Sequence, residues 1–341
     1  MKKNITILFF CFVAIASAQT LSPYITTVFD YSPAPGQFIN VLPKYEQGDT
    51  QQQMNQKAQE AIANNKRYLV CLGGWGGSIT FGFDHMITNQ PGAYDLQILG
   101  NTHDGGAEPG IVYVSFDEND NGLPDDTWYE IAGSEYNQPT TKHNYTLTYY
   151  RTPADHQPVP NGSIVDAQYI KYADTEGNIG YIEKNSYHTQ DYYPQWIEAD
   201  SLVFVGTLLA KNATFNRETG IFWLSSYDYG YADNHPNTSD SSKINLEWAV
   251  DAEGNPANLQ GIHFVRIQTG VSQSCGWIGE TSTELMGAID LHTPTALQVS
   301  NEAEDNVEKI YNLQGQQIIC PQKGHVYIIK TKNGKTIKQL F

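Results

Sequence analysis

The sequence predicts a mostly β fold, an elaborated β-sandwich of jelly-roll type with one short helix. Aromatic residues make up 12% of the 341 residues, with 22 Tyr against 13 Phe, and such residues suit the pleated surface of a sheet. From Tyr68 onward, short apolar or alternating runs are separated by Gly, Pro, Asn and Asp, as is typical of many short strands joined by turns. Only one segment before them has the periodicity of a helix.

The helix is expected at residues 50–63. Thr50 can accept a hydrogen bond from the first turn, and Gln53, three residues later, can complete a capping box. Its apolar face would consist of Met54, Ala58, Ala61 and Ile62.

The strands are expected at 67–72, 78–83, 94–99, 110–116, 127–132, 145–150, 167–172, 202–209, 221–224, 243–249 and 262–269. Short strands with turn signals between them are typical of a sandwich or barrel. We therefore expect one β-sandwich over residues 19–291. A linker at 292–306 and a small C-terminal β-domain at 307–341 complete the predicted organisation.

The amino terminus has the pattern of a secretory signal peptide, residues 1–18. Lys2 and Lys3 precede an apolar core at 5–15, and Ala16-Ser17-Ala18 forms a small-residue cleavage site before Gln19. The sequence has no run of about 20 apolar residues, so we expect no transmembrane segment. The predicted location is outside the cell, either secreted or on the outer cell surface.

The net charge and the cysteines exclude several classes of function. The formal charge is -17, and loss of Lys2 and Lys3 with the signal peptide makes it -17 - 2, or about -19. Such a surface repels phosphate backbones, so nucleic acid is not an expected partner. Beyond the signal, Cys71, Cys275 and Cys320 show no CxxC spacing, which argues against a zinc site or a disulfide framework. A single Cys71–Cys275 bridge stays open.

Residues 117–126, Asp-Glu-Asn-Asp-Asn-Gly-Leu-Pro-Asp-Asp, predict a structural Ca²⁺ loop, because they place side-chain oxygens at alternate positions before a glycine. The loop departs from an EF-hand, because Trp128 occupies position 12, where an EF-hand has Glu. Asp125 or Asp126 must therefore complete the coordination shell of the ion. Glu130 is a weaker candidate, and a metal-free acidic turn is the alternative. The expected ligands are Asp117, Asn119, Asn121, the carbonyl of Leu123, Asp125 and Asp126.

Two aromatic stretches are candidate ligand sites. In the segment 226–235, alternating tyrosines would share one face of an extended chain, where they can stack on sugars while neighbouring polar groups bind hydroxyls. The alternative is a tyrosine-rich loop that packs on the sandwich. The second stretch, 73–77, places Trp75 between glycine pairs, either as an exposed stacking platform or where strands pack closely. The candidate ligand-binding residues are Trp75, Tyr227, Tyr229, Tyr231, Asp233 and Asn234.

Nothing in the sequence identifies a catalytic centre. No Gly-x-Ser-x-Gly elbow is present, and the nine His are scattered. The stretch 273–277 is only faintly similar to a cysteine-protease nucleophile, so a buried or turn cysteine is expected at Cys275. Glycoside cleavage needs two carboxylates close in space, and sequence alone does not show whether any of four candidates meet. These candidates are Asp84, Glu108, Glu280 and Glu284.

The C-terminal residues resemble the sorting domain of type IX secretion substrates in Bacteroidetes. The shared features are Tyr311-Asn312-Leu313-Gln314-Gly315, the strand Gly324-His325-Val326-Tyr327-Ile328 and the basic end at 335–338. The resemblance covers about 35 residues and implies the type IX secretion machinery as a partner. It also implies removal or surface attachment of the tail.

The central region resembles the secreted cell surface proteins of Bacteroides and its relatives, which are sometimes labelled PKD-domain proteins. The resemblance rests on 33–38 (PAPGQF), 81–85 (FGFDH), 108–112 (EPGIV), 128–136 (WYEIAGSEY), 248–251 (WAVD) and 279–284 (GETSTE). A looser similarity to galactose-binding-like jelly rolls rests on 111–114, 128–131 and 264–267. These resemblances imply capture of a glycan, or of another nutrient such as a corrinoid.

Together these observations predict an exported, non-catalytic surface protein that binds a small ligand or glycan and is held rigid by Ca²⁺. A polysaccharide-active hydrolase or lyase on a jelly roll is the alternative, and it would need a cleft with two facing carboxylates. A structural or adhesive surface protein is a third possibility, which would have no concave aromatic site.

Overall fold

The computed structural model describes residues 21–293, 307–318, 326–331 and 336–340. Residues 22–293 form one compact unit, and the strands after residue 306 belong to a second. The expected signal peptide and residues 294–306 of the expected linker lie outside the described residues. In the described part of the chain, no helix is long and apolar enough to cross a membrane.

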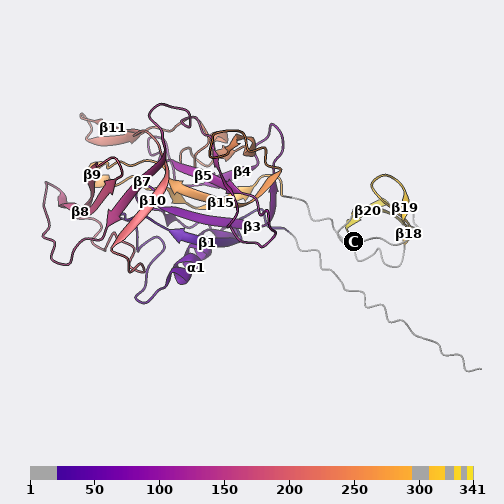
Figure 1. Cartoon of the computed structure of the whole chain (residues 1–341), viewed down its shortest axis with the longest axis horizontal. Helices are drawn as coiled ribbons and strands as arrows, with labels where there is room; N and C mark the ends of the chain where they lie inside the picture. Colours follow the sequence, from indigo (N-terminus) through magenta and orange to yellow (C-terminus); the bar gives the residue numbers. More distant parts are fainter. Residues whose placement is uncertain (1–20, 294–306, 319–325, 332–335, 341) are drawn as a thin grey trace, which may run out of the picture. The chain divides into compact units, whose positions relative to one another are not determined.

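The larger unit is built around a six-stranded antiparallel sheet, with β3, β15 and β5 at its centre (Figure 1). Its order is β1 (Thr27–Ser32), β3 (Ser78–Thr88), β15 (Gly261–Thr269), β5 (Gly110–Ser115), β6 (Trp128–Ile131) and β14 (Ala249–Val250). Alternate residues of the central strands, such as Ile79 and Phe81, are buried in the main hydrophobic core. Residues between them, such as Thr80 and Gln268, are buried as well, so both faces of the central strands are largely covered.

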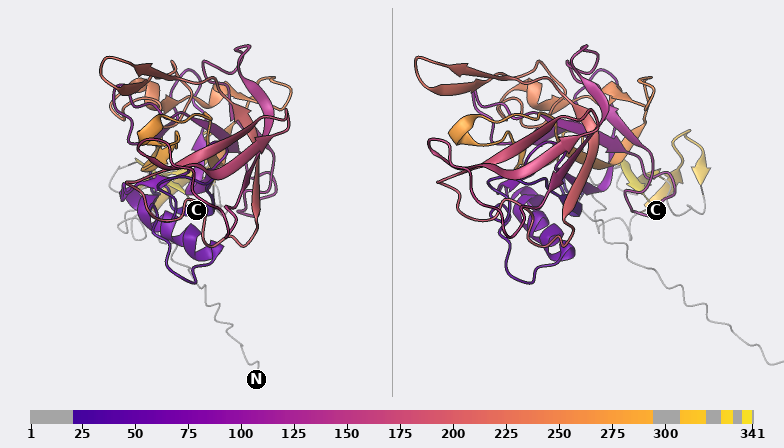
Figure 2. Two further views of the ribbon diagram at one scale, coloured as in Figure 1. Left: turned by 90° about the vertical axis from the view of Figure 1, so that its left-hand side faces the viewer. Right: turned by 60° about the vertical axis from the view of Figure 1, so that its left-hand side comes forward.

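A second antiparallel sheet contains β10 (Ser201–Leu208), β7 (Lys142–Tyr150), β8 (Ile164–Asp174) and β9 (Ile179–Asn185), in that order. Figures 1 and 2 show its strands crossing beside the first sheet. Tyr149, Ile170 and Ile182 of this sheet pack with Trp75, from the loop before β3, in a separate aromatic core. The predicted mostly β fold is confirmed and is consistent with a β-sandwich, while the jelly-roll strand order stays a prediction.

Short strands complete the unit and carry residues of the candidate site. One three-stranded sheet joins β13 (Lys243–Ile244), β4 (Leu96–Leu99) and β17 (Gly287–Asp290), and β2 (Val70–Cys71) pairs with β16 (Glu284–Leu285). A hairpin is formed by β11 (Ala213–Asn216) and β12 (Ile221–Leu224). In the β2–β16 pair, Glu284 lies opposite Cys71, which anchors this carboxylate beside the core.

The predicted helix is α1 (Gln51–Ile62), and it begins with the expected capping box between Thr50 and Gln53. The helix covers the edge of the large sheet. Asn55 Oδ1 accepts the Tyr31 N–H at 3.0 Å, and Gln59 Oε1 accepts the Val28 N–H at 2.9 Å. These bonds occupy donors of the edge strand β1, which would otherwise be available to pair with another chain.

The second unit contains a four-stranded antiparallel sheet, in the part of the chain where a small β-domain was expected. Its order is β19 (Gln317–Ile318), β18 (Val307–Tyr311), β20 (Val326–Thr331) and β21 (Thr336–Leu340).

The cysteines in the larger unit do not form the bridge that the sequence left open. Cys71 and Cys275 are both buried and free. The Cys71 thiol lies 2.9 Å from the Ser282 hydroxyl, and burial raises its pKa well above its usual value. Both groups therefore pack as small buried side chains.

Candidate functional site

The strongest candidate site is a pocket of about 380 Å³ with an acidic floor and an aromatic rim, which we call the acidic pocket. Segments far apart in the sequence form it. Its lining consists of Gln37, Phe38, Glu108, Tyr187, His188, Trp277, Ile278, Glu280, Ser282 and Glu284.

The floor of the acidic pocket is a cluster of carboxylates. Carboxylate oxygens of Glu108, Asp233 and Glu284 all lie within 4.8 Å of one another, and this cluster can hold a metal ion. Asp233 and Glu284 are buried, and Glu108 is half-buried. Glu284 lies in β16, Glu108 lies two residues before β5, and Asp233 belongs to the tyrosine-rich loop.

Asp233 is fixed by the backbone around it. Its Oδ1 accepts the N–H groups of Asn101 and Thr102, both at 3.0 Å, and the Thr102 hydroxyl at 2.5 Å. Its Oδ2 accepts the Glu284 N–H at 3.0 Å. A Cβ at Gly100 would lie 2.2 Å from Asp233 Oδ1, so only glycine permits this approach.

Glu280 is held on one side only. Its Oε1 accepts the Gln37 N–H at 2.8 Å, whereas its buried Oε2 has no hydrogen-bond partner. The residue is 8% exposed. A Cβ at Gly36 would lie 2.4 Å from Glu280 Oε1, so this glycine also lets the backbone approach the carboxylate.

No nearby base neutralises these four acids. Among the described residues, no Lys or Arg forms an ion pair with Glu108, Asp233, Glu280 or Glu284. Burial raises the pKa of Glu280 to about 7. Burial, and then the charge of neighbouring carboxylates, raise the pKa values of Glu108 and Glu284. The cluster therefore favours a bound proton or a bound cation.

The rim supplies flat, accessible surfaces. Trp277, in the short 3₁₀ turn Gly276–Ile278, is 52% exposed, and Tyr187 beside it is 72% exposed. Their ring centroids are 6.3 Å apart in an edge-to-face arrangement. Phe38 packs on His188 at 4.6 Å, and burial lowers the pKa of this histidine. The pocket thus combines acidic groups with rings on which a ligand can stack.

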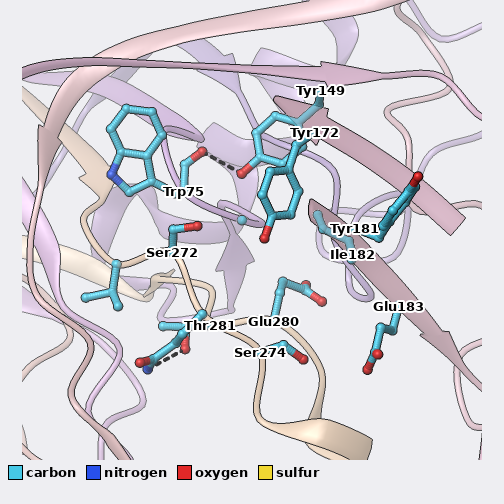
Figure 3. A pocket seen from close by; sticks show the side chains of 13 residues that line it. Trp75, Tyr149, Tyr172, Tyr181, Ile182, Glu183, Ser272, Ser274, Glu280 and Thr281 are labelled. Carbon is cyan, nitrogen blue, oxygen red and sulfur yellow. Dashed lines mark hydrogen bonds between the residues drawn. The ribbon is translucent and has the colours of Figure 1, made fainter. Parts of the chain in front are cut away.

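Glu280 also borders a smaller cavity of about 30 Å³, shown in Figure 3. Trp75, Tyr149 and Tyr172 line this cavity, and Figure 3 shows the Glu280 carboxylate and the Tyr172 hydroxyl extending into the same space. The Tyr149 hydroxyl donates to the Trp75 carbonyl at 3.0 Å. Glu280 therefore stands between the acidic pocket and the aromatic core of the second sheet.

The tyrosines of the loop 226–235 do not share one exposed face. The prediction of an extended segment with a common stacking surface is therefore wrong. Tyr227 and Tyr231 pack edge-to-face at 5.5 Å, and Tyr231 is buried, while Tyr229 packs on Trp248 at 4.7 Å. Asn234 is fully buried and bonds both backbone groups of Tyr227 at 2.8 Å. The loop has no strand at these tyrosines, and only Asp233 reaches the candidate site.

Trp75 is not an exposed stacking platform, because only 1% of its surface is exposed. Its Nε1 donates to the Thr207 carbonyl at 3.2 Å, and its ring packs edge-to-face on Tyr145. The alternative of close strand packing is correct. Gly76, with φ of +90°, lies where a Cβ would be 2.4 Å from Phe204.

The predicted Ca²⁺ loop is compact. Asp117 accepts the N–H groups of Asn121 at 3.1 Å and Gly122 at 2.8 Å. The Asn119 side-chain amide donates to Asp125 and Asp126, both at 3.3 Å, and the Asn121 amide also donates to Asp125. The Leu123 N–H donates to Asn121 Oδ1 at 2.7 Å. These polar side chains converge on one another, and Ca²⁺ binding here stays a prediction.

Glu130, the weaker candidate Ca²⁺ ligand, instead lines a separate pocket. Its Oε2 accepts the Thr207 hydroxyl at 2.6 Å, and burial raises its pKa to about 7. Between about pH 4.5 and 7, the folded chain therefore holds a proton that the unfolded chain releases, so this group's contribution to stability falls as pH rises.

We expect Glu130→Gln to remove this pH dependence, because glutamine keeps the acceptor oxygen without a charge. From pH 5 to pH 8, the wild-type free energy of unfolding should fall by up to about 3 kcal/mol more than that of the variant. Urea denaturation followed by far-UV circular dichroism at both pH values measures this. Equal losses in the two chains would contradict the assignment.

Sequence reasoning named three of the pocket's carboxylates, Glu108, Glu280 and Glu284, and the structure places all three in its lining. Asp84, the fourth candidate, instead pairs with His85 at 2.8 Å. The rim was missed. The one sequence signal near the rim was the stretch 273–277, whose cysteine is faintly similar to a protease nucleophile. The exposed residue of this stretch is instead Trp277.

Comparison with models of known protein families found no match, and a search of curated proteins found none either.

Proposed function

We propose that this chain is an exported, non-catalytic surface protein that binds a small hydroxyl-rich ligand in the acidic pocket. A glycan is the first candidate, and another nutrient such as a corrinoid is the second. The observation that carries the proposal is the combination of exposed Trp277 with buried, unneutralised carboxylates in one pocket. The signal-like amino terminus and the sorting-like tail support the location outside the cell.

The chemistry of the pocket suits a sugar. An aromatic ring covers the apolar face of a pyranose, while carboxylic acids with raised pKa values can both donate to and accept from its hydroxyls. The negative charge of the pocket disfavours anionic ligands. A purely structural or adhesive protein would need no concave aromatic site, so the pocket favours a binding protein.

The test is a panel of labelled neutral oligosaccharides and cyanocobalamin, applied to the chain beginning at Gln19. For any probe that the wild-type chain binds, Trp277→Ala should lower the affinity at least tenfold, because the stacking surface is lost. The matched control is Trp223→Ala, since Trp223 is 50% exposed but lies on the β11–β12 hairpin and does not line the pocket. No retained probe, or an equal loss in both variants, would overturn the proposal.

We also propose that residues 117–126 bind a structural Ca²⁺ ion. The convergence of polar side chains in this loop supports it, since five acidic residues in ten positions repel one another without a cation. At a Ca²⁺ concentration one hundred times the dissociation constant, we expect the free energy of unfolding to rise by about 2.7 kcal/mol over that in EDTA.

Thermal and urea melts of wild-type chain and Asp125→Asn, each with Ca²⁺ and with EDTA, measure this gain. The variant should lose the part of the gain that belongs to the loop. Glu218→Gln, an exposed substitution near the β11–β12 turn, should keep it. An equal gain in wild type and Asp125→Asn would show that the loop is an acidic turn.

A polysaccharide-active enzyme is the second candidate function, and one observation favours it. Glu280 has a free carboxylate oxygen and a pKa raised to about 7, which suits a proton donor near neutral pH. Any oligosaccharide retained in the panel should then be cleaved, with release of reducing ends or of unsaturated products that absorb near 235 nm. Loss of this activity in Glu280→Gln would support the enzyme, and an intact probe after long incubation would exclude it for that probe.

A further inference from the structure

The carboxylate cluster at the floor of the acidic pocket has the dimensions of a divalent-cation site. Oxygen ligands of Ca²⁺ lie about 2.3–2.6 Å from the ion, so two ligands on opposite sides are about 5 Å apart. Oxygens of Glu108, Asp233 and Glu284 lie within 4.8 Å of one another, so one ion can contact all three.

Charge supports the same conclusion. Asp233 accepts hydrogen bonds from three N–H groups and one hydroxyl, which favour its ionised form, but burial outweighs them and raises its pKa to about 6. Two further carboxylates are packed against this charge. Within the described residues, none of the three forms an ion pair with Lys, Arg or His. A divalent cation would neutralise them together, whereas protons would neutralise them one at a time.

A second, independent observation concerns Glu280, which lines the same pocket. Glu280 is 8% exposed and lines the acidic pocket together with Glu108 and Glu284, yet its Oε2 has no hydrogen-bond partner. A buried carboxylate oxygen without a partner is rare, because its desolvation is uncompensated. Water on a bound cation, or a hydroxyl of a ligand, would satisfy it.

We infer that Glu108, Asp233 and Glu284 bind a divalent, oxygen-preferring cation whose remaining coordination positions face the acidic pocket. Glu108 and Glu284 line the pocket, whereas Asp233 stands behind them. Three carboxylates do not complete the six to eight positions of Ca²⁺. Water, or a pair of hydroxyls from a ligand, would fill the rest. This inference rests on the cluster and holds whether or not a sugar binds.

The test uses Ca²⁺ and Tb³⁺ alone as probes, on the full mature chain carrying Asp125→Asn, so that the loop at 117–126 does not contribute. Calorimetric titration should show one Ca²⁺ per chain. Adding Glu284→Gln should weaken binding at least a hundredfold, because a neutral amide replaces a charged ligand. Adding Glu218→Gln instead should leave binding unchanged. No Ca²⁺ binding in the Asp125→Asn chain, or equal binding after Glu284→Gln, would overturn the inference.

Terbium luminescence gives a readout that does not depend on the stability of the Glu284 variant. Excitation of tryptophan should sensitise Tb³⁺ bound in the pocket, and Trp277→Leu should remove most of this emission while the ion still binds. Emission lifetimes in H₂O and D₂O count coordinated water, and we expect about two or more molecules. An ion with no coordinated water would show a closed site and would contradict the open positions.

Discussion

Replacing Asp233 with alanine is expected to lower the free energy of unfolding by about 3–5 kcal/mol. Four donors would lose their acceptor: the N–H groups of Asn101, Thr102 and Glu284, and the Thr102 hydroxyl. An unsatisfied buried donor costs about 1–3 kcal/mol. Asp233 also has a φ of +48°, where alanine is strained by roughly 1–2 kcal/mol. Loss of the repulsion that Asp233 exerts on Glu108 and Glu284 offsets part of this loss.

Asp233→Asn is the matched control. Asparagine tolerates the left-handed backbone and keeps one oxygen for Asn101 and Thr102, but its amide nitrogen cannot accept the Glu284 N–H. We therefore expect a loss of about 1–3 kcal/mol, smaller than that of alanine. Urea denaturation in EDTA separates this structural effect from any bound cation. If alanine and asparagine destabilise equally, the hydrogen bonds to Asp233 do not hold the loop.

Replacing Trp75 with alanine is the second large change, with an expected loss of about 3–5 kcal/mol. The indole is 1% exposed within the aromatic core of the second sheet, so its removal leaves a cavity. The carbonyl of Thr207 would also lose the donor that now lies 3.2 Å away. Far-UV circular dichroism during urea denaturation measures the loss without relying on tryptophan fluorescence.

Trp277→Ala is the control for Trp75→Ala, since it truncates the same residue type at an exposed position. Its free energy of unfolding should change by less than about 0.5 kcal/mol. If Trp75→Ala is equally mild, the aromatic core is not the packed interior that the structure describes.

The strands with clear alternation could be predicted from sequence. The expected segments 110–116 and 262–269 correspond to β5 and β15, and 78–83 is the first part of β3, which continues to Thr88. Alternate apolar residues of all three strands pack in the main core. Strand β1 was missed, since Pro33 and Pro35 directly after it obscured its end. Strand β9 was missed as well, because Ile182 is its one buried apolar residue and the strand therefore has no alternating apolar pattern.

The candidate site could be predicted only in part, for a physical reason. Glu108, Asp233 and Glu284 are brought together by hydrogen bonds between segments far apart in the sequence, such as that from the Glu284 N–H to Asp233. Such bonds depend on tertiary packing and leave no local spacing. The tyrosines of 226–235 show the opposite case, a local pattern that tertiary packing overrides. Their alternation suggested an extended segment, but Asn234 folds the loop back onto Tyr227.

We propose that the ligand binds in the acidic pocket and not on the tyrosines of the loop 226–235. The most direct measurement compares the affinity of a retained oligosaccharide probe for wild type, Trp277→Ala and Tyr229→Ala. Tyr229 is 40% exposed, so its truncation should leave the fold intact. We expect Trp277→Ala to lose binding at least tenfold and Tyr229→Ala to keep it. Loss of binding in Tyr229→Ala, with wild-type affinity in Trp277→Ala, would contradict the account.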